Sequence, residues 1–386
     1  MQNGFISAQI YLFCGINGKN SYICTMKIAI RKYLLLIILC CTTSYVGMAQ
    51  DILWNADFDF RFDNREYGDP SKMIAPSETL FGANMRPEIG LGWGYGHSLM
   101  LGTTLPADMG SEKFMGTPEL LAYYAYDGEK FSASLGLFPR KRLRGRYSYA
   151  FFSDSYRFYK PTIEGMLIQY GDTDWFVELG CDWNGLRSKT RREMFTIIFA
   201  GEARKGFSYA GYTATLHHHA SSDSARGVVD NGLADIYVGL DLSSIWYGVE
   251  LSFQAGWIQS YQNDRLHIGS PVMPGGYELE IKMKRNDLGL IDTFYKGEDL
   301  MPYWSLPYED GAGGIYGENL YFGDPFYRVG DKGFYNRFEL YWEPELNEGV
   351  NLRISSVHHF DGNHWGWQQV VSLAVYIGSE MFAPIR

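Results

Sequence analysis

A dense run of cations lies in the first half of the chain, where Arg140, Lys141, Arg142, Arg144 and Arg146 place five basic side chains within seven residues. Positive charge this concentrated attracts anions, above all where low-dielectric walls focus the field. The run therefore predicts a pore-lining site that favours phosphate, carboxylates or acidic sugars. A second interpretation stays open, in which the run lies near a membrane surface and pairs with acids of the protein or with lipid phosphates.

Two histidine clusters have residue types that suit metal binding or acid-base chemistry. They are His217, His218 and His219 in one place, and His358, His359, Asp361 and His364 in the other. Adjacent residues of a strand point to opposite faces, so only His217 and His219 share a face. We therefore predict no metal site and no cofactor, and expect ordinary hydrogen bonds from these imidazoles.

Serine precedes the second histidine cluster, in the order Ser355, Ser356, His358 and His359. A serine beside a histidine is the minimum for nucleophilic attack on an ester. Some outer-membrane barrels are lipid-modifying hydrolases with such a pair, but the His-x-Ser arrangement of the outer-membrane phospholipase and the lipid A deacylases is not reproduced. Our prediction is that the chain is not an enzyme, with a lipid hydrolase as the alternative.

The segment 297–333 is long and rich in aromatic side chains, which include Tyr303, Trp304, Tyr316 and Tyr321. Such rings can stack on sugars, which would make the chain a surface binding or adhesion protein. The alternative is that the same rings pack on one another and form a lid.

The amino-terminal part has the pattern of an export signal. Basic residues precede an apolar run that is too short to span a bilayer as a helix: Lys27, Arg31, Lys32 and the run 33–41. We predict a signal peptide over 26–49, and a non-native extension over 1–25 upstream of it. A lipoprotein is the alternative because Cys40 and Cys41 end the apolar run, but Leu39, which precedes Cys40, stands where a small residue is needed.

Composition limits what the rest of the chain can be. Without the leader, 30 basic residues face 44 acidic ones, a net charge of −14, which argues against nucleic-acid binding. Cys181 is the one cysteine left, so no disulfide framework is expected. No apolar stretch after the leader is long enough for a membrane helix, although aromatic residues make up 16% of the chain. These facts leave a membrane β-barrel or a soluble β protein.

Alternation of apolar and charged residues indicates strands along the whole of 50–386. In 54–63, for example, Trp54, Phe58 and Phe60 alternate with Asp57 and Asp59. Acids expected on the charged face, and so in the lumen of a barrel, are Asp57, Asp59, Glu88, Glu178 and Glu278. They either create a field across water or form structural ion pairs.

Connection lengths separate a barrel from a sandwich. Short turns are expected at 94–97, 127–130, 171–174, 202–206, 242–246, 285–287 and 344–349. Mostly longer loops alternate with them at 64–78, 106–116, 139–160, 183–191, 219–230, 261–274, 297–333 and 361–364. Seven turns and eight loops join about sixteen strands. We predict a single all-β domain, a transmembrane antiparallel barrel with short periplasmic turns and longer extracellular loops.

In strand number, turn asymmetry and a substantial third loop, the chain resembles the general porins of gram-negative bacteria. The resemblance covers 50–386 and is architectural, because no porin motif is matched residue by residue. It implies a passive channel of the bacterial outer membrane, in contact with outer-membrane lipid, for small, anionic or carbohydrate-like solutes. Porins are commonly trimers, and a homo-oligomer stays open here.

Overall fold

The computed structural model describes residues 49–67, 75–224, 226–266, 269–307 and 315–379. The predicted extension 1–25 and signal peptide 26–49 fall outside the described residues, apart from Ala49. In the described part of the chain, no helix is long and apolar enough to cross a membrane.

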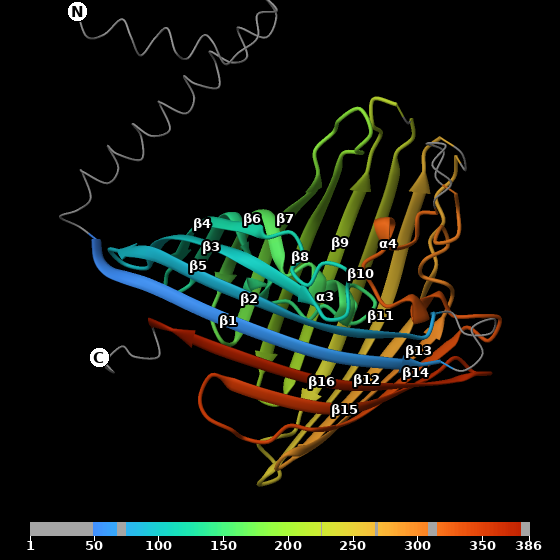
Figure 1. Cartoon of the computed structure of the whole chain (residues 1–386). Helices are drawn as coiled ribbons and strands as arrows, with labels where there is room; N and C mark the ends of the chain where they lie inside the picture. Colours follow the sequence, from blue (N-terminus) through green and yellow to red (C-terminus); the bar gives the residue numbers. More distant parts are fainter. Residues whose placement is uncertain (1–48, 68–74, 225, 267–268, 308–314, 380–386) are drawn as a thin grey trace, which may run out of the picture. The chain divides into compact units, whose positions relative to one another are not determined.

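Sixteen antiparallel strands form one closed barrel, in which each strand pairs with its sequence neighbours and β1 pairs with β16. Figure 1 shows β1 in blue beside β16 in red at this closure. The strands are β1 (Ala49–Glu66), β2 (Glu78–Trp93), β3 (His97–Asp108), β4 (Glu119–Asp127), β5 (Phe131–Pro139), β6 (Thr162–Gly171), β7 (Trp175–Gly185), β8 (Met194–Lys205), β9 (Ser208–His219), β10 (Val229–Asp241), β11 (Val249–Asp264), β12 (Gly275–Arg285), β13 (Leu288–Gly297), β14 (Phe334–Trp342), β15 (Val350–Phe360) and β16 (Trp365–Gly378). The prediction of an all-β barrel of about sixteen strands is confirmed.

Period-two alternation decides which face of each strand meets the lumen. In β1, Asp57 and Asp63 are buried on the inner face, whereas the apolar side chains between them point outward. Large outward side chains such as Ile89, Leu101 and Ile236 stay exposed, as a lipid-facing wall requires.

All seven predicted turns separate strands, and the longer loops leave the opposite end of the barrel. The β12–β13 connection has only Asn286 and Asp287, and Asn286 has φ 53°, a left-handed conformation that asparagine tolerates. Two expected starts were wrong by four residues, because the turn expected at 202–206 begins only after Lys205 and the loop expected at 261–274 only after Asp264. Glu202 and Arg204 continue the inward row of β8 and form an ion pair at 2.7 Å, which keeps the strand extended.

Two loop segments fold into the barrel. The first inward segment, residues 140–161, contains η1 (Arg140–Arg142) and α3 (Asp154–Tyr159). The second inward segment, described over 298–307 and 315–333, contains α4 (Gly317–Leu320) and η2 (Pro325–Arg328). Their apolar side chains share one buried cluster, and Ser153 donates its backbone N–H to the carbonyl of Phe322 at 2.8 Å. The barrel interior is therefore packed by its own loops.

Candidate functional site

The predicted basic run lies deep in the barrel, and each of its five cations contacts the wall. Arg140 donates to Asp182 (2.7 Å), Lys141 to Asp57, Arg142 to Asp127 (2.5 Å), Arg144 to the carbonyl of Asp172 (2.7 Å) and Arg146 to Glu202 (2.5 Å). Asp127 ends β4 and Asp172 lies in the β6–β7 turn, so the run reaches the short-turn end of the barrel. The structure thus places four of these cations in ion pairs with wall acids, whereas Arg144 is hydrogen-bonded to a backbone carbonyl of the wall.

The five lumenal acids lie on the inner wall and serve as anchors there. Glu178 accepts hydrogen bonds from the backbone N–H groups of Arg144 and Gly145 (2.8 and 2.9 Å) and from the hydroxyl of Tyr147 (2.6 Å). Glu278 accepts from the hydroxyl of Tyr327 in the second inward segment. The other three acids also have partners: Asp57 pairs with Lys141 and lies 3.6 Å from Arg86, Asp59 pairs with Arg86, and Glu88 accepts from Tyr123 (2.7 Å).

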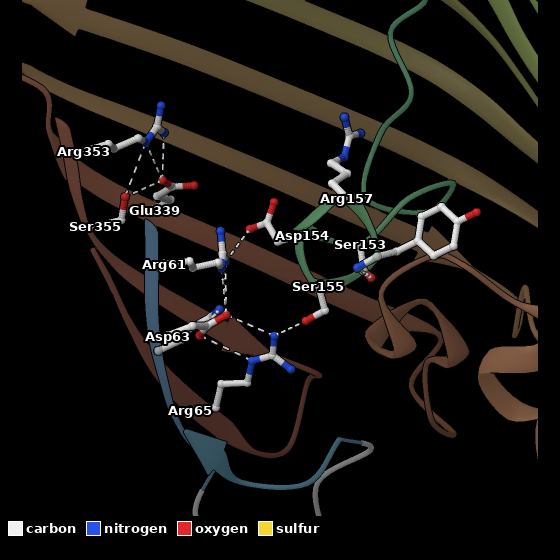
Figure 2. Close-up of polar contacts among 12 residues, drawn as sticks. Arg61, Asp63, Arg65, Ser153, Asp154, Ser155, Arg157, Glu339, Arg353 and Ser355 are labelled. Carbon is white, nitrogen blue, oxygen red and sulfur yellow. Dashed lines mark hydrogen bonds and ion pairs between the residues drawn. The ribbon is translucent and has the colours of Figure 1, made fainter. Parts of the chain in front are cut away.

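A buried ionic network joins α3 to the wall, as Figure 2 shows. The Asp154 carboxylate lies 3.1 Å from Arg61 of β1 and 3.9 Å from Arg337 of β14. Burial disfavours the charged form of Asp154, but the guanidiniums of Arg61, Arg337 and Arg157 outweigh burial and lower the pKa to about 2. The network continues outward, where Arg65 donates to Ser155 at 2.5 Å. Asp154 is therefore held as a carboxylate that fixes the position of α3.

Two lumenal cavities flank this network. The outer cavity, of about 630 Å³, is lined at the loop end of the barrel by groups that include Glu78, Lys160 and Trp304. The inner cavity, of about 470 Å³, lies below it and is lined by groups that include Arg86 and Lys141. Both cavities are lined by Arg140 and Asp154, so these two side chains stand between them.

The aromatic residues of the second inward segment mostly pack inward. Tyr303, Tyr316 and Tyr321 are buried, and Tyr321 stacks with Trp304 at 5.9 Å between ring centroids. Trp304 and Tyr321 line the outer cavity. The segment thus presents two of the four predicted rings to that space.

The inward histidines are parts of the packed interior. His359 bonds Tyr335 through Nδ1 and Gln368 through Nε2, both at 2.8 Å. His217 bonds Thr196 at 2.9 Å, and the His217 and His219 rings lie 6.3 Å apart at 44°. Among the described residues, no three metal-ligating side chains converge.

The outward face of β13–β15 carries a polar patch that sequence reasoning did not assemble. We name this set the outer-wall patch: Asp292, Asn336, Ser356 and His358. Ser356 Oγ lies 3.1 Å from Nε2 of His358, and Trp367 of β16 donates its Nε1–H to the same Oγ at 2.9 Å. Asn336 donates to Asp292 at 2.6 Å. Polar groups on a lipid-facing wall are costly, which marks the outer-wall patch as a functional candidate.

An aromatic row covers the loop side of the outer-wall patch. Phe294, Phe334, Phe360 and Trp365 contact one another in sequence, with ring centroids 4.9, 5.8 and 6.1 Å apart. In β13, β14 and β15, the aromatic residue lies closer to the loop end of the barrel than the patch residue of the same strand. Trp365 lies at the loop end of β16, the neighbour of β15. Aromatic girdles mark the boundary between hydrocarbon and headgroups. The Ser356–His358 pair therefore lies close to the depth at which the acyl esters of outer-leaflet lipid are found.

The two-residue period of a β-strand already predicted part of the Ser356–His358 site. Ser356 and His358 are two residues apart and share a face, whereas Ser355 and His359 face the lumen, where Ser355 donates to Glu339 at 2.8 Å. Which face meets lipid, and which tryptophan contacts the pair, depend on the β15–β16 register that sets His358 opposite Trp367.

Comparison with solved structures places the fold among outer-membrane barrels. OmpT lacking loop L8, an outer membrane protein of Vibrio cholerae, aligns with a TM-score of 0.52 at 9% identity, over 85% of this chain and 100% of that one. OprD of Pseudomonas aeruginosa has a TM-score of 0.47 at 10% identity, over 86% and 96% of the two chains. OccK2 of the same organism, solved with glucuronate, has a TM-score of 0.48 at 8% identity, over 86% and 99%. The predicted porin-type architecture and outer-membrane location are confirmed.

Sequence comparison adds a family. No curated protein sequence matches the chain. The profile of the lipid A 3'-O-deacylase-type family matches residues 55–299, from β1 to the second inward segment. This family is named for an enzyme, so our prediction that the chain is not an enzyme was wrong. The prediction relied on the missing His-x-Ser arrangement, which describes only one way to build an ester hydrolase. The match spans more than half of the residues of the chain, so the chain belongs to the lipid A 3'-O-deacylase-type family.

Proposed function

We propose that the chain is an outer-membrane hydrolase that removes ester-linked acyl chains from outer-leaflet lipid, with Ser356 as nucleophile and His358 as base. The observation that carries this proposal is the 3.1 Å contact between Ser356 Oγ and His358 Nε2 on the lipid-facing wall. Family membership supports the reaction class, and the family name suggests a 3'-acyl ester of lipid A as substrate. The matched segment ends before β14, so the choice of these two residues rests on geometry.

The proposed reaction has two steps. Ser356 Oγ attacks the ester carbonyl carbon while its proton passes to Nε2 of His358, and the lipid alcohol then leaves with that proton. Trp367 Nε1–H, now 2.9 Å from Oγ, is placed to donate to the oxyanion that forms in the transition state. Water, deprotonated by His358, then releases the fatty acid and restores Ser356. His358 Nδ1 is buried and has no hydrogen-bond partner among the described residues. The pair is therefore a dyad without a third group that orients the imidazole.

The test is fatty-acid release from lipid A by the refolded barrel in mixed micelles. Ser356→Ala is expected to abolish release, whereas its inward neighbour Ser355→Ala, the matched control, is expected to retain it. A fluorophosphonate probe should label the wild type and not Ser356→Ala. Equal release by Ser356→Ala and wild type would exclude the Ser356–His358 dyad as the active site, whereas the proposed ester hydrolysis itself would stand. A folded wild type without any release would overturn the proposed function.

A second candidate function is passage of small, anionic or carbohydrate-like solutes, as the porin resemblance implies. The observation that favours it is the pair of lumenal cavities separated by Arg140 and Asp154. Planar-bilayer conductance in a salt gradient is the test, with Arg142→Glu expected to shift the reversal potential toward cations. Arg142 suits this test because its partner Asp127 is exposed, so the fold should tolerate the reversal. A folded barrel that never conducts would exclude this candidate.

A further inference from the structure

A shallow groove of about 790 Å³ crosses the outer wall from β8 to β12. Two outward rows border it, and the register aligns them strand by strand. The upper row is Ala203, Ala210, Val238, Ala255 and Leu279, and the lower row is Lys205, Ser208, Leu240, Phe253 and Ile281. The row between them points into the lumen, so its backbone forms the floor. Three alanines in the upper row leave the space that larger side chains would fill.

The groove rises from the short-turn rim into the membrane. Lys205 is the last residue of β8 and Ser208 the first of β9, whereas Ile281 lies four residues before the end of β12. With strands spaced about 4.8 Å apart, four steps give a length of about 19 Å. The groove is thus polar at the rim and apolar toward the membrane interior.

A polar pocket of about 240 Å³ continues the groove at the rim. Arg204, Ser208 and Tyr209 line both spaces, and Ser243 and Ser244 of the β10–β11 turn line the pocket alone. Arg204 is held by Glu202 at 2.7 Å and by Asp241 at 3.7 Å, whereas Lys205 is exposed beside them. Because Arg204 belongs to the inward row, Lys205 of the groove supplies the exposed positive charge at this rim, and the pocket adds the hydroxyls of Ser243 and Ser244.

Exposed aromatic side chains place this pocket at the periplasmic headgroup level. Phe207 lies in the β8–β9 turn, and Trp246 and Tyr247 lie in the β10–β11 turn. Their exposed fractions are 53%, 53% and 106%. Aromatic belts of this kind lie at membrane–water interfaces. A molecule in the groove would therefore have its polar end among periplasmic headgroups and its apolar end among acyl chains.

We propose that the groove and pocket hold a glycerophospholipid of the periplasmic leaflet. Its phosphate meets Lys205 and the hydroxyl of Ser244, where charge and hydrogen-bond donors are complementary to it. One acyl chain lies between the two outward rows, from Ser208 toward Leu279. This seat is on a different part of the wall from the outer-wall patch and faces the other leaflet, so the inference does not depend on the proposed hydrolase.

Native mass spectrometry of the refolded barrel with dioleoyl phosphatidylglycerol tests the seat. The wild type is expected to retain one lipid after micelle removal. Ala210→Trp fills the groove and should weaken retention about tenfold through lost apolar burial. Ala133→Trp, an outward alanine of β5 away from the groove, is the matched control and should retain the lipid.

Lys205→Glu tests the headgroup contact without touching the groove floor. It should weaken retention of phosphatidylglycerol, whereas Lys189→Glu in the loop between β7 and β8 should not. Because Lys205 is exposed at the rim, this variant keeps the test decisive even where Ala210→Trp fails to fold. Equal retention by Lys205→Glu and wild type, or equal loss in Ala210→Trp and Ala133→Trp, would overturn the proposal.

Discussion

Tyr147 donates its hydroxyl hydrogen to Glu178 Oε1 over 2.6 Å, so a carboxylate of β7 holds the first inward segment against the wall. The same carboxylate accepts the backbone N–H groups of Arg144 and Gly145. A single buried acid thus satisfies three donors of a segment that has no strand partner.

Replacing Glu178 with alanine should lower the free energy of unfolding by about 3 kcal/mol or more, because several buried donors lose their acceptor at once. Urea unfolding followed by tryptophan fluorescence measures the change. Glu164→Ala, an exposed acid on the neighbouring β6, is the control and should differ little from wild type. Equal losses in the two variants would show that Glu178 is not an anchor.

Asp154 should make stability depend on pH at the acid end. Its pKa in the folded barrel is about 2, below its ordinary 3.8, so its ionised form stabilises the fold above about pH 4. This contribution is lost as pH falls from 4 toward 2. Unfolding midpoints measured across that range should fall more steeply for wild type than for Asp154→Asn. Parallel pH profiles would exclude Asp154 as the source.

Tyr327→Phe should loosen the second inward segment while leaving the barrel closed. The substitution keeps the ring but removes the hydroxyl that donates to Glu278, leaving a buried carboxylate with one partner fewer. Hydrogen exchange should become faster in peptides from 315–333 and stay unchanged in those from 140–161. Faster exchange in both segments would mean that they open as one unit.

Trp367→Phe should slow fatty-acid release more than it weakens lipid binding. The variant keeps an aromatic ring beside Ser356 but has no Nε1–H, and removal of one oxyanion donor typically lowers kcat by about 10² to 10³. Trp365→Phe, which contacts the His358 ring at 5.3 Å, serves as control and should keep kcat within a small factor. A rise in KM alone would assign Trp367 to lipid binding.

Much of the barrel could be predicted because strand alternation and turn chemistry are local. The β12–β13 turn at Asn286 and the charged inner face of β1 both follow from neighbouring residues. The partners of the basic run could not be predicted, since Arg140 meets Asp182 from a strand 42 residues away. The Ser356–His358 pair was partly visible as two residues on one face, but its Trp367 contact and its lipid-facing side depend on a register that only the assembled wall fixes.

Closure of the sheet also constrains the order of assembly. β1 pairs with β16 from Asn55 opposite Gly378 to Glu66 opposite Trp367, so the first and last strands of the barrel complete the sheet together. Until the last strand is present, both edges stay unpaired and open to wrong partners. The first inward segment contacts both β1 and β14, through Asp154, and so links strands that lie on either side of that seam. Closure of the barrel thus waits for the carboxyl-terminal strand.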